Sequence, residues 1–196
     1  MSNITQIQVN TLAPFTLDYS SRLSASEIAR RTKIPQQTAS RYLNKLVKDN
    51  LLEYKREGRN KLFSLDLKKE TSRIILNSIE NEKSLQFLLK NKGLHVIIEE
   101  ILGYCDSLIV FGSYASGTFN EDSDLDLVIF GKADKEEIKK VKRKSGLEIV
   151  EHYVSHKEFE KILLSNNPLS LEILNNHIIF GDLSGIVNIF LRKIKK

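Results

Sequence analysis

Two aspartates stand two residues apart in a stretch that is otherwise apolar. The stretch "SDLDLVIF", residues 123–130, predicts a β-strand, and side chains two residues apart on a strand leave the same face. Asp124 and Asp126 are therefore expected to point the same way. Two like charges side by side are unfavourable unless a cation joins them. A divalent metal ion is the cation that this pair predicts.

A glycine and a serine precede this pair in the chain. The apolar run "SLIVF", residues 107–111, predicts a buried strand, and Gly112 and Ser113 follow it at the start of the turn "GSYASG". A glycine at a strand-to-helix turn lets backbone amides approach a ligand, and a helix N-terminus favours phosphate. A phosphate cradle followed by a carboxylate pair is an arrangement for holding a metal–nucleoside triphosphate.

This stretch resembles the signature of the polymerase-beta-like nucleotidyltransferases, particularly their minimal form. In "GSYASGTFNEDSDLDL" the pattern GS-x-x-x-G-x-x-x-x-x-S-D-x-D is filled by Gly112, Ser113, Gly117, Ser123, Asp124 and Asp126. The resemblance implies that the first four bind the nucleotide, with ATP expected, and that the two aspartates are catalytic ligands of Mg²⁺. It implies two ions, which Mn²⁺ can replace. Ser116 stands where many relatives carry Arg.

The family also uses a third carboxylate from a later strand. The segment "SGLEIVEHYV" offers Glu148 and Glu151, and two-residue alternation places them on opposite faces. The chain resembles winged-helix nucleotidyltransferase proteins end to end, including their Gly-x-Glu-Ile run, and this implies that Glu148 is the third catalytic acid and metal ligand. Many relatives have Asp there. Glu151 is interpreted as a solvated strand residue and His152 as structural.

The N-terminal end carries the signals of two short helices joined by a tight turn. Ser24 and Glu27 form a capping box, and the helix that they begin ends at "TKIP". Pro35 suits the first turn of a second helix, whose buried side is predicted from three- and four-residue spacing. That side contains Ala39, Tyr42, Leu43, Leu46 and Val47. The polar side supplies the predicted DNA-reading residues Gln36, Gln37, Ser40, Arg41 and Lys45.

A hairpin is predicted directly after these helices. "LLEY" and "KLFSL" are expected as strands joined by "KREGRN", with cations at Lys55, Arg56, Arg59 and Lys61. Together the helices and the hairpin resemble the winged helix-turn-helix regulators of bacteria and archaea. The resemblance implies that these cations lie along the phosphate backbone of double-stranded DNA. The alternative is that the module serves in dimerisation or protein docking.

Charge is distributed unevenly along the chain. Of 30 Lys and Arg and 25 Asp and Glu, residues 1–66 carry 11 and 6, so the formal net charge of +5 sits entirely at this end. A basic module followed by a neutral one predicts a polyanionic partner for the first module alone.

We therefore expect an α+β protein: an N-terminal winged helix-turn-helix joined to a C-terminal polymerase-beta-like nucleotidyltransferase domain, a mixed sheet flanked by helices. The expected bounds are 1–67 for the first domain, 68–92 for a connecting helical segment and 93–196 for the second domain. The segment's apolar stripe, Ile74 to Leu89, predicts a homodimer, the alternative being packing against its own chain.

Other features exclude several classes of protein. Cys105 is a lone cysteine among apolar residues, which excludes an intramolecular disulfide and favours a buried, unreactive thiol. No apolar run is long enough to span a membrane and no signal sequence is present, so a cytoplasmic protein is expected. Two alternatives to an active enzyme stay open: a regulator that senses a nucleotide, and an antitoxin-like protein that modifies a toxin-like partner.

Overall fold

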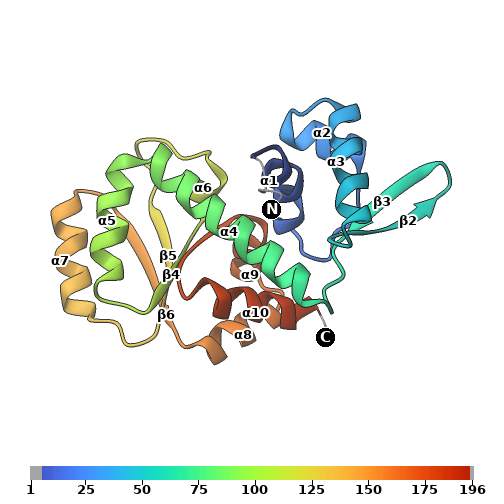
Figure 1. The fold of residues 1–196 in the computed structure, drawn as a ribbon. Helices are drawn as coiled ribbons and strands as arrows, with labels where there is room; N and C mark the ends of the chain where they lie inside the picture. The colour runs from blue at the N-terminus through green and yellow to red at the C-terminus, as the bar shows by residue number, and fades with distance from the viewer. Residues whose placement is uncertain (1–5, 195–196) are drawn as a thin grey trace. The chain divides into compact units, whose positions relative to one another are not determined.

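The computed structural model describes residues 6–194 and consists of two compact units, Met1–Ile79 and Glu80–Lys196 (Figure 1). The first holds short helices and a small antiparallel sheet, and the second holds a mixed four-stranded sheet with helices on both faces. The predicted α+β class, with a mixed sheet in the C-terminal part, is confirmed.

The first unit begins with helix α1, Gln6–Leu12, and a 3₁₀ turn η1, Ala13–Thr16. Its remaining elements are β1 (Leu23–Ser24), α2 (Ala25–Thr32), α3 (Gln36–Lys48), β2 (Glu53–Glu57) and β3 (Asn60–Ser64). The strands pair antiparallel in the order β1-β3-β2. These elements are a helix-turn-helix followed by a wing.

The starts of helices α2 and α3 lie close to where the sequence predicts them. The Ser24 hydroxyl accepts a hydrogen bond from the Glu27 amide at 3.2 Å, and the Glu27 carboxylate accepts one from the Ser24 amide at 2.9 Å, which completes the capping box. Pro35 is the N-cap of α3 instead of a first-turn residue. On α3, Ala39, Leu43 and Leu46 are buried as predicted, whereas Tyr42 and Val47 are half-buried at the margin of the inner side.

The hairpin is tighter than predicted. β2 continues to Glu57 and β3 begins at Asn60, so the turn has two residues instead of the six of "KREGRN". Gly58 takes φ +59°, a conformation that lets two residues reverse the chain with the twist that a hairpin needs. Lys55, Arg56 and Lys61 consequently lie on the strands and only Arg59 lies in the turn.

A single helix, α4 (Glu70–Lys90), occupies most of the predicted connecting segment. Ile75, Leu76, Ile79 and Phe87 of this helix are buried. Its exposed large apolar side chains are Ile74, Leu85 and Leu89.

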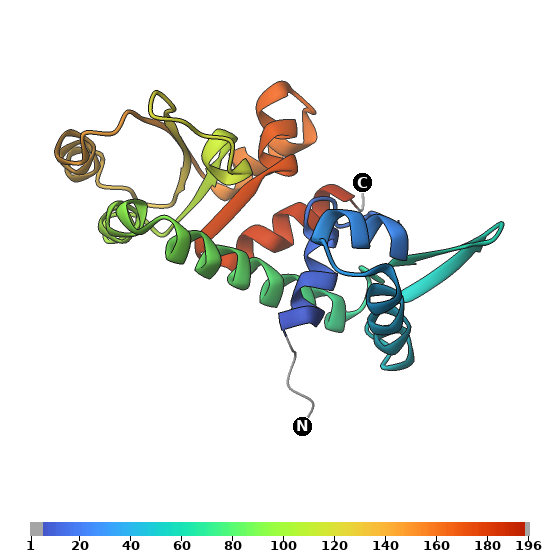
Figure 2. The same cartoon turned by 90° about the horizontal axis from the view of Figure 1, so that it is seen from above.

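The second unit orders its strands β6-β5-β4-β7, with β5 and β6 parallel and the other pairs antiparallel. The strands are β4 (Ser107–Phe111), β5 (Leu125–Phe130), β6 (Ile149–Val154) and β7 (His177–Gly181). The helices are α5 (Lys92–Leu102), α6 (Gly112–Ser116), α7 (Lys135–Ser145), α8 (His156–Leu164), α9 (Pro168–Asn175) and α10 (Leu183–Ile194). Helices α5 and α7 lie side by side along one face of the sheet (Figures 1 and 2).

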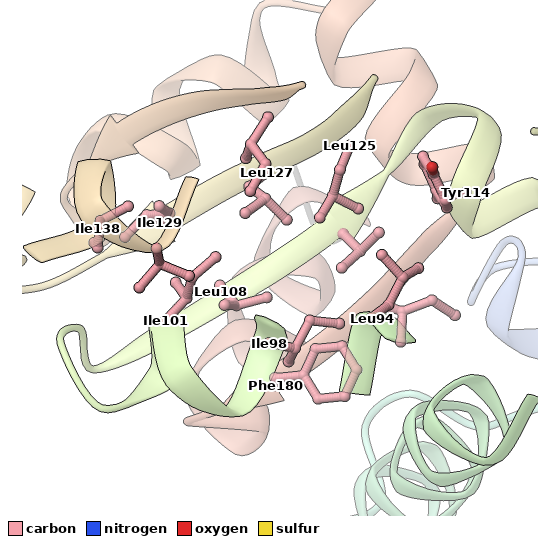
Figure 3. Close-up of a cluster of buried hydrophobic side chains, with 14 of the residues drawn as sticks. Leu94, Ile98, Ile101, Leu108, Tyr114, Leu125, Leu127, Ile129, Ile138 and Phe180 are labelled. Carbon is pink, nitrogen blue, oxygen red and sulfur yellow. The ribbon is translucent and has the colours of Figure 1, made fainter. Parts of the chain in front are cut away.

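Alternation along the strands divides the side chains of this unit into two cores. Leu125, Leu127 and Ile129 of β5 pack with Ile98 and Ile101 of α5 beneath the α5–α7 layer (Figure 3). Cys105 packs against the same cluster, and its burial raises the pKa of the thiol to about 11. A thiol of this kind is unreactive near neutral pH.

The opposite core is built from aromatic rings of β5, α8 and α10. Phe130 and Phe159 meet edge to face at 4.9 Å between ring centroids, and Phe159 lies 6.0 Å from Phe190. The ring of His177 lies 4.7 Å from that of Phe190. The even-numbered residues of β5, including Asp126, belong to this face of the sheet.

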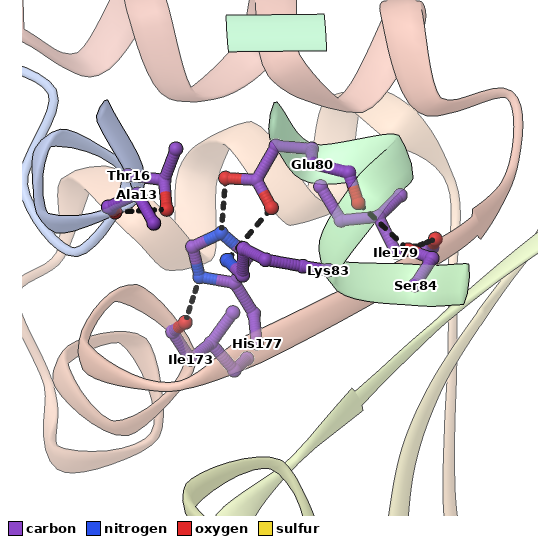
Figure 4. Close-up of polar contacts among 8 residues, drawn as sticks. All are labelled: Ala13, Thr16, Glu80, Lys83, Ser84, Ile173, His177 and Ile179. Atoms are coloured by element: carbon purple, nitrogen blue, oxygen red, sulfur yellow. Dashed lines mark hydrogen bonds and ion pairs between the residues drawn. The ribbon is translucent and has the colours of Figure 1, made fainter. Parts of the chain in front are cut away.

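A buried polar cluster joins α4 to the start of β7 (Figure 4). His177 Nδ1 lies 2.9 Å from the carbonyl oxygen of Ile173, and Nε2 lies 3.2 Å from Glu80 Oε1. Lys83 Nζ lies 2.7 Å from the other oxygen of Glu80. Burial raises the pKa of Glu80, but attraction by His177 and Lys83 outweighs it and lowers the pKa to about 2.

Within residues 6–194, the longest apolar stretch of any helix falls short of what crossing a membrane requires.

Candidate active site and nucleic-acid interface

The strand register brings the two parts of the predicted nucleotide site together at one edge of the sheet. Phe111, the last residue of β4, pairs with Asp126 on one side and with His177 on the other. Directly paired residues share a face of the sheet. Because Gly112 follows Phe111 at once, the turn predicted to hold phosphate begins beside the Asp126 carboxylate.

Gly112 and Asp126 are in direct contact. Gly112 is buried, has φ +68°, and a Cβ placed on it would overlap the carboxylate of Asp126. A residue with a Cβ at this position is therefore disfavoured by the left-handed backbone and would have to displace the Asp126 carboxylate. The glycine of the signature suits the position of the acid as well as the turn.

Helix α6 is one short turn whose end is closed by its own side chains. The Ser116 hydroxyl donates to the carbonyl oxygen of Ser113 at 3.0 Å and lies 2.8 Å from the Thr118 hydroxyl. Gly117 ends the helix with φ +75°. Ser116, which replaces the arginine of many relatives, thus contacts the helix itself. Ser113 is half-buried in the first turn, next to Gly112.

Ser123 shapes the loop that leads to the acidic pair. Its hydroxyl accepts a hydrogen bond from the Asn120 amide at 2.9 Å and lies 3.1 Å from Asn120 Oδ1. The Asp122 amide donates to that same oxygen at 3.0 Å. Asp124 is exposed and directly precedes β5, so this turn determines where the strand and its first acid begin.

Two other acids act on Asp126 at this edge. Burial and the negative charges of Glu172 and Asp124 raise the pKa of Asp126 above its ordinary value, while His152 lowers it. The ionised form of Asp126 is therefore disfavoured in the arrangement as it stands. A bound cation would relieve this repulsion, so the donors present fit a divalent metal.

The structure does not assemble three protein ligands around one point. Among the described residues, no group of three His, Cys, Asp or Glu side chains is placed to hold a metal ion. Mg²⁺ is commonly bound through one or two carboxylates together with the phosphates of a substrate. Asp124 and Asp126 fit that kind of site, in which the nucleotide supplies the remaining oxygens.

Glu148 lies close to the pair through its backbone, but its side chain turns elsewhere. Its carbonyl oxygen accepts a hydrogen bond from the Leu125 amide at 2.9 Å, while its carboxylate, 66% exposed, lies 3.0 Å from Lys142 Nζ. Lys142 also lies 3.6 Å from Glu151. The expectation that the two glutamates lie on opposite faces is wrong, because β6 begins only at Ile149 and alternation does not reach Glu148. The hydrogen bond to Glu148 raises the pKa of Lys142.

Sequence reasoning missed one acidic neighbour of Asp126 and discounted a histidine that also acts on it. Glu172 lies on α9, which leads into β7, and no spacing in the sequence relates it to the aspartates. His152 was interpreted as structural, yet it is exposed on the Asp126 face, with its ring 6.0 Å from that of Phe111. The signal available for His152 was that two-residue alternation places it on the same face as Glu148, the predicted third acid.

The first unit presents the predicted DNA-reading residues together. Gln36, Gln37, Ser40, Arg41 and Asn44 line one shallow hollow on α3. Lys45 is also exposed on this helix, and Lys55, Arg56 and Arg59 are exposed on the wing. Lys61 differs because it is half-buried and contacts α3.

Two family models match the chain in the predicted order. Residues 15–61 match the MarR family, and residues 92–179 match the family described as nucleotidyltransferase domain. The chain joins a MarR-family winged helix to a nucleotidyltransferase domain.

One solved structure, a crystal structure of a MarR family transcription regulator, is similar to the chain at 18% identity and a TM-score of 0.37. The similarity covers 46% of this chain and 59% of that one. No curated protein matches the chain. The assignment rests on the two family matches.

The match to the nucleotidyltransferase domain runs from α5 into β7 and contains the whole candidate site, Glu172 included. The MarR-family match contains all nine predicted DNA-binding residues. Neither match supports the toxin-like partner.

Proposed function

We propose that this chain is a DNA-binding nucleotidyltransferase. Its C-terminal domain transfers a nucleoside monophosphate from a nucleoside triphosphate, with ATP as the expected donor, to a hydroxyl group of an acceptor. The hydroxyl attacks the α-phosphorus and pyrophosphate leaves. The winged helix holds the protein on double-stranded DNA and gives the chain a regulatory role. The observation that carries the proposal is the contact between Gly112, which begins the turn proposed to hold phosphate, and Asp126, the acid proposed to hold the metal, within the part of the chain that matches a nucleotidyltransferase domain.

The residues of the site have separate tasks in this reaction. Gly112 and Ser113 offer backbone amides and a hydroxyl to the triphosphate, and Ser123 holds the loop that aims Asp124. Asp124 and Asp126 would hold Mg²⁺, which would neutralise phosphate charge and lower the pKa of the acceptor hydroxyl. Glu148 completes the site as the third acid after leaving Lys142. Charge neutralisation and positioning supply most of the catalysis.

DNA binding is proposed from the surface of the first unit. The polar hollow on α3 offers amide and guanidinium groups of the kind that read base edges in the major groove. The exposed wing cations Lys55, Arg56 and Arg59 are suited to phosphate contacts, which fix the position of a protein on the duplex without reading its sequence.

Transfer is tested by incubating the full chain with each α-labelled nucleoside triphosphate, Mg²⁺ and host lysate, and following label into protein or RNA. We expect label in an acceptor with the parent chain and none with Asp126→Asn. Omitting Mg²⁺ should abolish transfer. Equal labelling by the parent chain and by Asp126→Asn would contradict the proposal.

A second function is favoured by two contacts of the structure. Glu148 is paired with Lys142, and Ser116, in the arginine position, closes α6. Both contacts would suit a domain that binds a nucleotide without transferring it, so that the chain acts as a nucleotide-sensing regulator. Equilibrium binding of the labelled nucleotide without transfer to any acceptor would select this function.

A further inference from the structure

Lys61 is placed differently from the other cations of the wing. Lys55, Arg56 and Arg59 are exposed, whereas Lys61 is half-buried and directed back toward the recognition helix α3. Its ammonium group donates to Asn44 Oδ1 at 2.6 Å and lies 4.0 Å from the centroid of the Tyr54 ring. A hydrogen-bond acceptor and an aromatic face therefore both engage this one charge.

Asn44 carries the contact into the reading surface of α3. Its amide nitrogen donates to the carbonyl oxygen of Ser40 at 2.7 Å and lies 3.4 Å from the Ser40 hydroxyl. The amide is oriented at both ends, because its oxygen faces a donor and its nitrogen faces an acceptor. Ser40 and Asn44 both line the hollow that we propose reads DNA bases.

The strand register explains why Lys61 takes this position. Lys61 is the direct partner of Arg56 across the hairpin, and like charges opposite each other on a sheet are unfavourable. Turning the Lys61 ammonium toward Asn44 and Tyr54 gives it an acceptor and an aromatic face. Arg56 is left as the exposed cation of the pair.

We propose that Lys61 is a positioning residue that fixes the wing to the recognition helix and sets base selectivity, and that it is not a phosphate contact. The inference rests on the proposed DNA binding of the first unit and revises the expectation that Lys61 belongs with the phosphate-binding cations. A phosphate contact by Lys61 would compete with Asn44 and Tyr54 for the same ammonium group, whereas the exposed wing cations have no comparable side-chain contact among the described residues.

The two roles differ in how binding depends on salt. Each phosphate contact releases about one counterion, so its loss lowers the slope of log K against log salt by about one. Loss of a positioning residue leaves that slope unchanged. It lowers instead the ratio of affinities for a selected sequence and for random DNA, because the reading surface is no longer held at one angle to the wing.

The test compares Lys61→Met with Arg56→Met in the full chain. A preferred duplex is selected from random DNA, and its dissociation constant and that of random duplex are measured over a range of salt. For Lys61→Met we expect an unchanged slope and a specificity ratio about tenfold lower. For Arg56→Met we expect a slope lower by about one and an unchanged ratio. A lower slope for Lys61→Met would overturn the proposal.

Amide hydrogen exchange without DNA separates this inference from the proposed function. Lys61→Met is expected to speed exchange in the β2–β3 hairpin, and Arg56→Met is not. Equal exchange in the two variants would contradict the proposal that the Lys61–Asn44 contact holds the hairpin against α3. If the parent chain binds no DNA, both the proposed DNA binding and the role of Lys61 in base selectivity are overturned. Faster exchange in Lys61→Met would still show that the Lys61–Asn44 contact stabilises the hairpin.

Discussion

Gly112 and Asp126 occupy positions that depend on each other. The glycine adopts a left-handed backbone conformation against the carboxylate, and the acid lies where any side chain at position 112 would be. The two residues are brought together by the β4–β5 pairing, in which Phe111 faces Asp126. A substitution at either residue is therefore expected to change the position of the other.

Gly112→Ala should abolish nucleotide transfer while the domain stays folded. The added methyl group displaces the Asp126 carboxylate, and the left-handed conformation costs about 1–2 kcal/mol of stability for a residue with a Cβ. Gly146→Ala is the matched control, because Gly146 also has φ +68° but open space around its Cβ position. Both variants should lose similar stability in thermal unfolding, and only Gly112→Ala should lose transfer. If both variants lost transfer, the effect of Gly112→Ala would be explained by backbone strain alone and not by displacement of Asp126.

Asp126→Asn should leave stability unchanged or slightly raised and remove transfer. Burial, Glu172 and Asp124 raise the pKa of Asp126, so its ionised form costs stability at pH values above its ordinary pKa. Replacing the charge removes that cost together with a metal ligand. The unfolding temperature and the label-transfer assay measure the two effects, with the exposed Asp122→Asn as control. A clearly lower unfolding temperature for Asp126→Asn would show that the acid is structural.

Removing Glu172 should shift the pH dependence of the reaction. Its negative charge raises the pKa of Asp126, so Glu172→Gln lowers that pKa and keeps Asp126 ionised at lower pH. We expect the acidic limb of the transfer rate to move to lower pH. Rates measured across pH, with ionic strength held constant, show the shift. An acidic limb that stays in place would mean that another group controls it.

Glu148→Gln should reduce transfer at least about tenfold if Glu148 is the third acid. Glu151→Gln is the matched control, because both carboxylates pair with Lys142 but Glu151 has no proposed catalytic task. Single-turnover rates at saturating nucleotide should fall for the first variant only. An equal effect of the two substitutions would show that the pairing with Lys142, and not catalysis, is what matters.

Glu80→Gln should destabilise the second unit by about 3–5 kcal/mol at pH 7, because it leaves buried His177 without its charged partner. The pKa of Glu80 is lowered to about 2, so its stabilising effect is complete above its ordinary pKa of 4.5. That effect is lost as pH falls toward 2, so the difference in free energy of unfolding between the parent chain and Glu80→Gln should become smaller over this range. Denaturant unfolding at several pH values measures it, with the neighbouring Glu82→Gln as control. A gap that is constant with pH would contradict the ion pair.

Much of this protein was determined by its sequence alone, because the signals involved are local. The capping box of Ser24 and Glu27 and the shared face of Asp124 and Asp126 depend on contacts or alternation within a few residues. The same is true of the inner side of α3. Short-range hydrogen bonds and the periods of helix and strand decide such features wherever the element lies in the fold. The two modules and their order were predicted from such local patterns together with the family resemblances that the motifs carry.

Only the tertiary structure decided which distant side chains meet. Glu172 acts on Asp126 because α9 leads into β7, which pairs with β4 beside the acid. Glu148 turns to Lys142 because β6 begins only at Ile149, and Lys61 turns to Asn44 from a strand position directly opposite Arg56. Such encounters depend on strand order and register, which no local spacing encodes, and a shift of one residue redirects a side chain.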